Sequence, residues 1–267
     1  MCEISSGQSL RIIAITNQKG GVGKTTTAIN LAAALAELNK KILLVDIDPQ
    51  GNASTGLGID ENQRMQTTYD LLFNKRALDS VISQSSVENL FVIPSNMTMS
   101  FADVELMEQK KRSFLLRQVL RQEKMKTLGF NFIFIDCPPS LNLMTVNAMV
   151  AAHAILVPLQ SEFFALEGLS QLILTVREVR KTGNQNLRID GILLTMFDRR
   201  NNLSHQVAED VRKTLGELVF KTVIPRNVRL SEAPSHAMPV LTYDTHSSGA
   251  KAYRDLANEF LEIHAHQ

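Results

Sequence analysis

The chain has 267 residues, of which 44% are hydrophobic and 21% are charged, and its formal net charge is +1. This composition is sufficient for a full hydrophobic core and excludes long disordered regions, while a nearly neutral chain can still carry a local basic patch. Two cysteines without metal or redox spacing, the lack of a long apolar run and the lack of a signal-peptide pattern predict a cytoplasmic protein.

Short apolar runs alternate with longer amphipathic segments along the chain. Runs that are apolar on both faces are typical of buried parallel strands, so we predict an α/β fold with one twisted, mostly parallel sheet of about seven or eight strands and helices on both faces. The expected strands are Leu10–Thr16, Lys41–Asp46, Leu90–Ile93, Phe132–Asp136, Ala154–Pro158, Ile189–Thr195 and Val219–Ile224. The expected helices are Thr25–Leu38, Phe101–Met125, Thr145–Ala151, Leu166–Lys181 and Ser204–Leu215.

No linker, internal repeat or low-complexity segment divides the sequence. Residues 1–267 are therefore expected to form a single domain, in which residues 1–9 are a flexible N-terminal segment. The least regular region is 51–90. Within it the glycine-rich stretch Gly51–Asp60 is expected to be a mobile loop, whereas Thr67–Phe73 and Ala77–Ile82 have the pattern of short helices.

The stretch from Ile12 to Thr26, IIAITNQKGGVGKTT, joins the first expected strand to the first expected helix through a glycine-rich turn. Glycines let the backbone approach a phosphate closely, successive N–H groups form an anion nest, and the positive end of the helix dipole lies at the same point. We therefore expect Lys24 to contact the terminal phosphates of a nucleotide and the Thr25 hydroxyl to bind Mg²⁺.

This motif departs from the ordinary pattern G-x-x-x-x-G-K-[ST] in two ways. Gln18 stands at the position of the first glycine, and a second lysine, Lys19, directly precedes the glycines of the loop. It resembles the deviant P-loop of the ParA/Soj chromosome-partition ATPases, within the MinD-like group of P-loop NTPases. The resemblance implies an ATPase domain in which Lys19 crosses a dimer interface to the partner's nucleotide, so that ATP joins two copies of the chain. It also implies contacts with ATP or ADP from Lys19, Gly20, Gly21, Val22, Gly23, Lys24, Thr25 and Thr26.

Two further strands are expected to end in carboxylates at the ligand-binding edge of the sheet. Residues 42–52 read ILLVDIDPQGN, and either acid, Asp46 or Asp48, could simply cap a turn when considered alone. The resemblance implies that Asp48 positions the attacking water and that Asp46 supports it. Residues 132–140 read FIFIDCPPS, in which Asp136 has the Walker-B arrangement that holds Mg²⁺ directly or through water. The predicted catalytic residues are Lys19, Lys24 and Asp48, and the predicted metal ligands are Thr25, Asp48 and Asp136.

The segment Val223–His236, VIPRNVRLSEAPSH, resembles the family's block beside the nucleotide base, which implies that Pro225 and Asn227 flank adenine. Residues 177–229 hold 11 basic and 6 acidic residues, and residues 109–126 hold 7 and 1. These counts fit solvated helix faces as well as a patch for a polyanion. The resemblance implies that the ATP-bound dimer binds nonspecific double-stranded DNA through Arg200 and Arg229.

The resemblance further implies a ParB-type centromere-binding partner, association with the nucleoid, and a role in chromosome or plasmid segregation. The alternative is a MinD-like membrane-surface ATPase in cell-division positioning. That class ends in a lysine-rich amphipathic helix, whereas AKAYRDLANEFLEIHAHQ has two basic and three acidic residues, so no membrane binding is expected. An iron–sulfur protein of this fold would need paired cluster cysteines, and a nucleotide-switched repressor would need a helix-turn-helix before the first strand, where only about ten residues stand.

Overall fold

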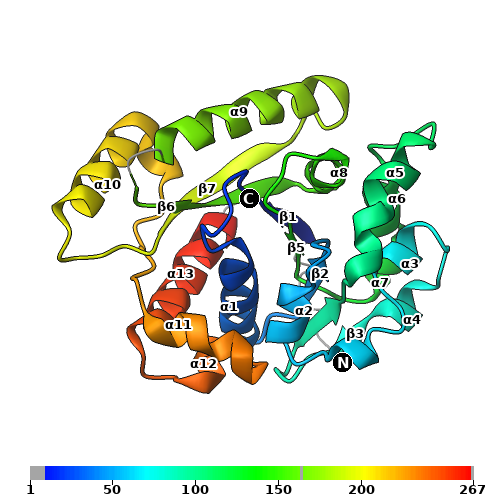
Figure 1. The fold of residues 1–267 in the computed structure, drawn as a ribbon, viewed down its shortest axis with the longest axis horizontal. Helices are drawn as coiled ribbons and strands as arrows, with labels where there is room; N and C mark the ends of the chain where they lie inside the picture. Colours follow the sequence, from blue (N-terminus) through cyan, green and yellow to red (C-terminus); the bar gives the residue numbers. More distant parts are fainter. Residues whose placement is uncertain (1–9, 163–164, 266–267) are drawn as a thin grey trace, which may run out of the picture.

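The computed structural model describes residues 10–162 and 165–265, so the expectation for residues 1–9 lies outside the described residues. In the described part, one seven-stranded sheet has the order β3-β4-β2-β5-β1-β6-β7, and only β3 and β4 pair antiparallel (Figure 1). The predicted α/β class is therefore confirmed. The strands are β1 (Arg11–Ile15), β2 (Ile42–Asp46), β3 (Ser83–Gln84), β4 (Leu90–Ile93), β5 (Phe132–Asp136), β6 (Ala154–Gln160) and β7 (Arg188–Thr195).

Helices cover both faces of the sheet, and each face has its own hydrophobic core. Successive strand residues point to opposite faces, so Ile12 enters one core and Ile13 the other. No helix among residues 10–162 and 165–265 is long and apolar enough to cross a membrane. The helices are α1 (Lys24–Glu37), α2 (Asn52–Gly56), α3 (Thr68–Leu72), α4 (Leu78–Val81), α5 (Ala102–Met107), α6 (Leu115–Leu120), α7 (Glu123–Thr127), α8 (Leu143–Ala151), α9 (Ala165–Thr182), α10 (Asn202–Leu215), α11 (Val228–Glu232), α12 (Val240–Tyr243) and α13 (Ser248–Ala265), with 3-10 turns η1 (Glu61–Gln63), η2 (Met97–Phe101), η3 (Gly216–Leu218) and η4 (Ala233–His236).

The expected strand Val219–Ile224 is wrong. This segment runs alongside β7 and the residues just after it, but it forms only isolated bridges with them. One bridge joins Val219 to Ile192, and the other joins Pro225, the residue after the segment, to Phe197. The reason is a competing acceptor on α13. The backbone N–H groups of residues 221 and 222 donate to the two carboxylate oxygens of Glu259, at 2.6 and 2.9 Å, instead of to a neighbouring strand.

Two helix and loop expectations also need correction. Phe101–Met125 is not one helix but the end of η2 followed by α5, α6 and α7. The segment 109–112 offers no apolar side chain to bury, and its basic run 110–112 places like charges together. Gly51–Asp60 is not simply a loop, because it contains α2. Here Ser54 fixes the backbone by donating to Asp46 through both N–H and hydroxyl. The two short helices expected in 67–82 are confirmed as α3 and α4.

The strand order brings the predicted site together. β5 lies between β1 and β2, with Asp136 in register with Ile15 on one side and with Asp46 on the other. The glycine-rich loop follows β1, and Asp48 follows β2. Since parallel strands end at the same edge of the sheet, three motifs that are far apart in the sequence converge on one place.

Candidate nucleotide-binding site

The loop between β1 and α1 is held by buried side chains from neighbouring strands. The Asn17 amide donates to the carbonyl of Pro158 on β6 at 2.8 Å, and its Oδ1 accepts from the N–H of Lys19 at 3.1 Å. On the other side, the hydroxyl of Thr195, the last residue of β7, donates to the Val22 carbonyl at 2.9 Å. The loop is therefore positioned by the sheet on which it rests. Neither Asn17 nor Thr195 was predicted, because each acts on a residue that is distant in the sequence.

Two glycines give the loop its shape. Gly21 and Gly23 have φ angles of +73° and +86°, a region that other residues enter only at a cost of about 1–2 kcal/mol. Gly23 is the N-terminal cap of α1, and no side chain of the described residues caps this end. The first N–H groups of a helix have no partners within it, so together with the helix dipole they provide a site for an anion.

The two lysines of the loop lie in different surroundings. Lys24 is 6% exposed, and its Nζ donates to the Lys19 carbonyl at 2.8 Å. Burial lowers the pKa of Lys24, an effect that is opposed chiefly by Asp136. The Lys19 side chain is half-exposed and forms an ion pair with Glu162, just beyond β6. Lys24 thus faces the interior of the site, whereas a second molecule can reach Lys19.

Asp136 is a buried carboxylate without a partner. It is fully buried, and neither of its oxygens accepts a hydrogen bond from the described part of the chain. Burial, and next the charge of Asp46, raises the pKa of Asp136 well above its usual range, while the nearby Thr25 hydroxyl and the Lys24 ammonium oppose this rise. Burying a charged carboxylate is costly, and Lys24 and Thr25 offset this cost only in part, so this position is suited to a further cation.

The two acids at the end of β2, Asp46 within the strand and Asp48 just beyond it, differ in their surroundings. Asp46 is fully buried, its Oδ2 accepts from the N–H and hydroxyl of Ser54 at 2.9 and 2.7 Å, and its Oδ1 accepts from the N–H of Asp48 at 3.1 Å. Burial raises the pKa of Asp46 to about 6, although the bonds from Ser54 oppose this. Asp48 is 9% exposed, and its Oδ1 accepts from the N–H of Gln50. Asp46 thus positions the backbone that carries Asp48.

The donor set fits Mg²⁺ that is shared with a nucleotide. Magnesium is usually bound by one or two carboxylates together with phosphate oxygens. Thr25 on α1, Asp48 after β2 and Asp136 on β5 supply a hydroxyl and two carboxylates at one edge of the sheet. Within the described ranges, no group of three or more His, Cys, Asp or Glu side chains is placed to hold a metal ion. The protein residues are therefore suited to a metal that phosphates also coordinate.

A cavity of about 380 Å³ extends from the glycine-rich loop, a size that is typical of small-molecule sites. Gly23 and Thr26, at the start of α1, line it, and so does Tyr253 of α13. Pro225 and Asn227, the two residues predicted beside adenine, both line it. The remaining lining residues are Gln160, Thr195, Met196, Ile224, Arg226, Leu230, Ser231 and Pro234.

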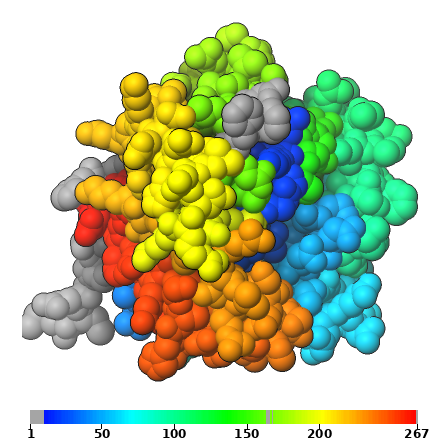
Figure 2. All heavy atoms as spheres, turned by 60° about the vertical axis from the view of Figure 1, so that its left-hand side comes forward, coloured from blue at the N-terminus to red at the C-terminus, as the bar shows by residue number. Residues whose placement is uncertain are grey.

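A second hollow, which we call the basic groove, adjoins this cavity and has a volume of about 910 Å³. Residues 225–227 line both hollows. Figure 2 shows α10 in yellow, the segment around residue 230 in orange and α13 in red meeting on this face. Five basic and two acidic residues among the lining give a local charge of +3: Arg199, Arg200, Lys221, Arg226 and Lys251 against Asp198 and Asp255.

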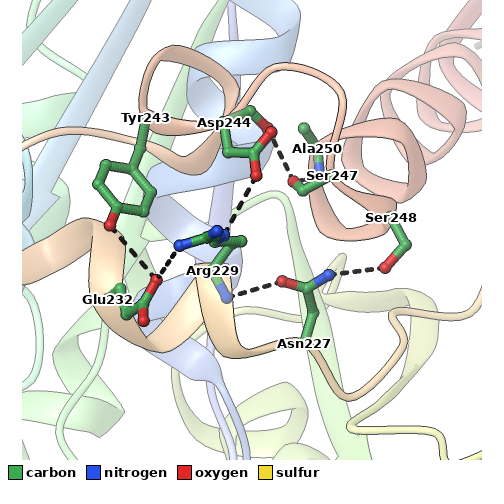
Figure 3. A network of polar contacts seen from close by, with 8 residues as sticks. All are labelled: Asn227, Arg229, Glu232, Tyr243, Asp244, Ser247, Ser248 and Ala250. Carbon is green, nitrogen blue, oxygen red and sulfur yellow. Dashed lines mark hydrogen bonds and ion pairs between the residues drawn. The ribbon is translucent and has the colours of Figure 1, made fainter.

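The structure separates the two arginines predicted to bind DNA. Arg200 lines the basic groove with its side chain 92% exposed. Arg229 does not belong to that lining and is ion-paired with Glu232 and Asp244 (Figure 3). The basic stretch 109–126 lies over α6 and α7, on the other side of the molecule from α10 (Figure 1). The 109–126 stretch does meet the start of the 177–229 stretch, where Arg117 donates to the Gly183 carbonyl at 2.9 Å, so it is separate only from the part of 177–229 that lies on α10.

Comparisons with known proteins agree with this geometry. A family model described as an AAA domain matches residues 10–189. The chain is 52% identical over 257 residues to the chromosome partitioning protein ParA of Caulobacter vibrioides, covering 96% of each chain. It is 52% identical over 249 residues to the sporulation initiation inhibitor protein Soj of Bacillus subtilis, covering 93% of this chain and 97% of Soj. A solved cobyrinic acid a,c-diamide synthase from Mycobacterium smegmatis, with bound ADP and magnesium, has a TM-score of 0.80 and 34% identity, covering 95% of this chain and 94% of that one.

Proposed function

The chain belongs to the ParA/Soj family of chromosome-partitioning ATPases, and we propose that it is an ATP-gated DNA-binding protein. It hydrolyses ATP with Mg²⁺, forms a sandwich dimer when ATP is bound, and binds double-stranded DNA without sequence preference. With a ParB-type partner it segregates a chromosome or plasmid. The observation that carries the proposal is that residues 225–227 form the wall between the nucleotide cavity and the basic groove.

The chemistry of the site follows from its geometry. The loop N–H groups and the Lys24 ammonium bind the phosphates, and Asp48 holds and orients the attacking water. Thr25, Asp48 and Asp136 would hold Mg²⁺, which when bound neutralises charge on the phosphate oxygens. Asp46 keeps the Asp48 backbone in place through its bond to that N–H group. Since phosphoryl transfer mainly needs positioning and charge neutralisation, these groups are sufficient for hydrolysis.

The position of Lys19 supports the ATP-dependent dimer. Its only ion pair among the described residues is with Glu162, and both side chains are about two-fifths exposed (41% and 43%). Such exposed pairs contribute less than about 1 kcal/mol, so Lys19 is readily released. In the dimer it reaches the nucleotide of the other copy. ATP favours the dimer only because its γ-phosphate interacts better with the closed state than ADP does.

The basic groove supports DNA binding by charge rather than by base reading. Its net charge of +3 comes from residues of three chain segments, and Arg200 extends into solvent. Contacts between such residues and phosphates release counterions, so binding weakens steeply with salt and does not depend on sequence. The shared wall of residues 225–227 gives nucleotide binding a physical connection to the groove. Association with the nucleoid would follow from this binding.

The test is duplex-DNA binding by the wild type, Asp48→Ala and Lys19→Ala, each with ATP, ADP or no nucleotide, over a salt series. We expect the wild type to bind only with ATP, Asp48→Ala to bind and remain bound because it closes without hydrolysing, and Lys19→Ala not to bind. Lys181→Ala is the matched control, because Lys181 is also an exposed lysine paired with one glutamate. If DNA binding were the same with and without ATP, and anionic liposomes captured the ATP-bound form, the proposal would be overturned in favour of a membrane-surface ATPase.

A further inference from the structure

Arg229 is held by acidic side chains from α11 and from the end of α12. Its Nη1 donates to Glu232 Oε2 at 2.8 Å, and its Nε lies 3.3 Å from Asp244 Oδ2. The Tyr243 hydroxyl donates to the same Glu232 oxygen at 3.3 Å, which orients that carboxylate. Figure 3 shows the guanidinium between the two acids. The charged side chains are 51%, 39% and 35% exposed, so DNA can reach them from solvent.

This arrangement opposes direct contact between Arg229 and a phosphate. Two carboxylates against one guanidinium leave the three side chains with a net charge of −1, which repels a polyanion. The nitrogen fork that binds a phosphate is the same one that binds a carboxylate. Here Glu232 and Asp244 already engage Nη1 and Nε. A phosphate therefore competes with Glu232 at Nη1 and with Asp244 at Nε when it forms a paired contact.

The backbone places Arg229 immediately beside the basic groove. Asn227 Oδ1 accepts from the N–H of Arg229 at 2.8 Å, and its Nδ2 donates to the hydroxyl of Ser248 at 2.6 Å, where α13 begins. Asn227 and Val228 both line the groove. Arg229 thus lies one residue beyond the lining, on a helix whose start is fixed. Release of its side chain needs rotamer changes only, without movement of α11.

We propose that Glu232 and Asp244 form an acidic clamp that competes with DNA phosphates for Arg229 and thereby sets the DNA affinity of the ATP-bound protein. This inference rests on the proposed DNA-binding function. The clamp acts as an internal anion, which DNA displaces and which binds Arg229 again when DNA leaves. Because half-exposed ion pairs are weak, the clamp lowers the affinity for DNA without preventing binding.

The test is the double variant Glu232→Gln/Asp244→Asn, measured by fluorescence anisotropy with labelled duplex DNA and ATP over a salt series. We expect binding about 3- to 10-fold tighter than wild type at 0.1 M salt, with a salt dependence steeper by about one phosphate contact. The same two changes in an Arg229→Ala background should increase the DNA affinity less than about twofold, because the arginine for which the acids and DNA compete is absent. Glu209→Gln/Glu217→Gln is the matched control, which removes two exposed acids from α10 and η3.

The outcomes separate the clamp from the proposed function. Equal gains with and without Arg229, or a gain no larger than in the control, would show a general charge effect and refute the clamp. A loss of affinity would mean that the acids hold Arg229 in its binding position, which also refutes it. If no protein binds DNA with ATP, both proposals fail. ATP affinity should stay unchanged in the double variant, since neither acid lines the nucleotide cavity, and this measurement verifies that the variant is folded.

Discussion

The hydroxyl of Thr195 offers a sharp test of how the sheet positions the phosphate loop. Thr195 is 2% exposed, and its hydroxyl donates to the Val22 carbonyl at 2.9 Å. Thr195→Val replaces this hydroxyl with a methyl group of similar size, so no cavity forms. The change leaves the carbonyl of a buried loop residue without its donor. That carbonyl belongs to the peptide whose N–H is on Gly23, at the phosphate end of α1.

Leaving a buried acceptor unpaired costs about 1–3 kcal/mol. If the loop keeps its conformation, this cost appears as a lower free energy of unfolding. If the Val22–Gly23 peptide rotates to find another partner, its N–H leaves the phosphate site and the cost appears as weaker nucleotide binding, about tenfold for each 1.4 kcal/mol. We therefore expect the two losses together to amount to about 1–3 kcal/mol.

The assay combines urea unfolding of the nucleotide-free protein with calorimetric titration of ATP. Thr175→Val is the control, because the Thr175 hydroxyl also donates to a backbone carbonyl, at 3.2 Å, but on the exposed face of α9. We expect changes below about 0.5 kcal/mol for the control. A Thr195→Val protein that unfolds and binds ATP like the wild type would refute the view that Thr195 positions the loop.

Two further predictions concern buried titratable groups. Asp136→Asn removes the carboxylate that we assign to Mg²⁺, so we expect ATP affinity to be the same with Mg²⁺ and with EDTA, whereas wild type binds more tightly with Mg²⁺; a retained Mg²⁺ effect would contradict the assignment. His153 Nδ1 accepts from the N–H of Ile12 at 2.9 Å, and burial, with help from Arg121, lowers the pKa of His153 to about 4. Because the pKa is lower in the folded state, the neutral ring stabilises the fold above pH 6.5, and this contribution is lost as the pH falls from 6.5 towards 4. Allowing for solvent screening, we expect the free energy of unfolding to fall by about 1–2 kcal/mol more for wild type than for His153→Gln between pH 7.5 and 4.5. Parallel curves of unfolding free energy against pH for the two proteins would contradict this.

Sequence patterns predicted the structure correctly where the deciding interactions are between residues that are close together in the chain. The apolar runs that alternate with amphipathic segments correctly predicted six of the strands, because a strand buried on both faces needs a continuous apolar run. The glycines of the phosphate loop were informative because few other residues tolerate the φ angles of Gly21 and Gly23. Local patterns failed where a distant group decides, as at Val219–Ile224, where Glu259 of α13 accepts from the N–H groups of residues 221 and 222.

The sequence by itself determined the fold class, the phosphate loop and the carboxylates at the strand ends, since each depends on residues that are adjacent or regularly spaced. Only the tertiary structure decided which side chains hold the phosphate loop in place and which of the predicted functional side chains are already engaged in ion pairs. The anchors Asn17 and Thr195 act on residues 141 and 173 positions away. Arg229 has the same sequence signal whether it is free or clamped, yet Asp244, 15 positions further on, occupies it in the folded chain. Such pairings depend on which elements meet in the fold, and no local pattern in the chain encodes that.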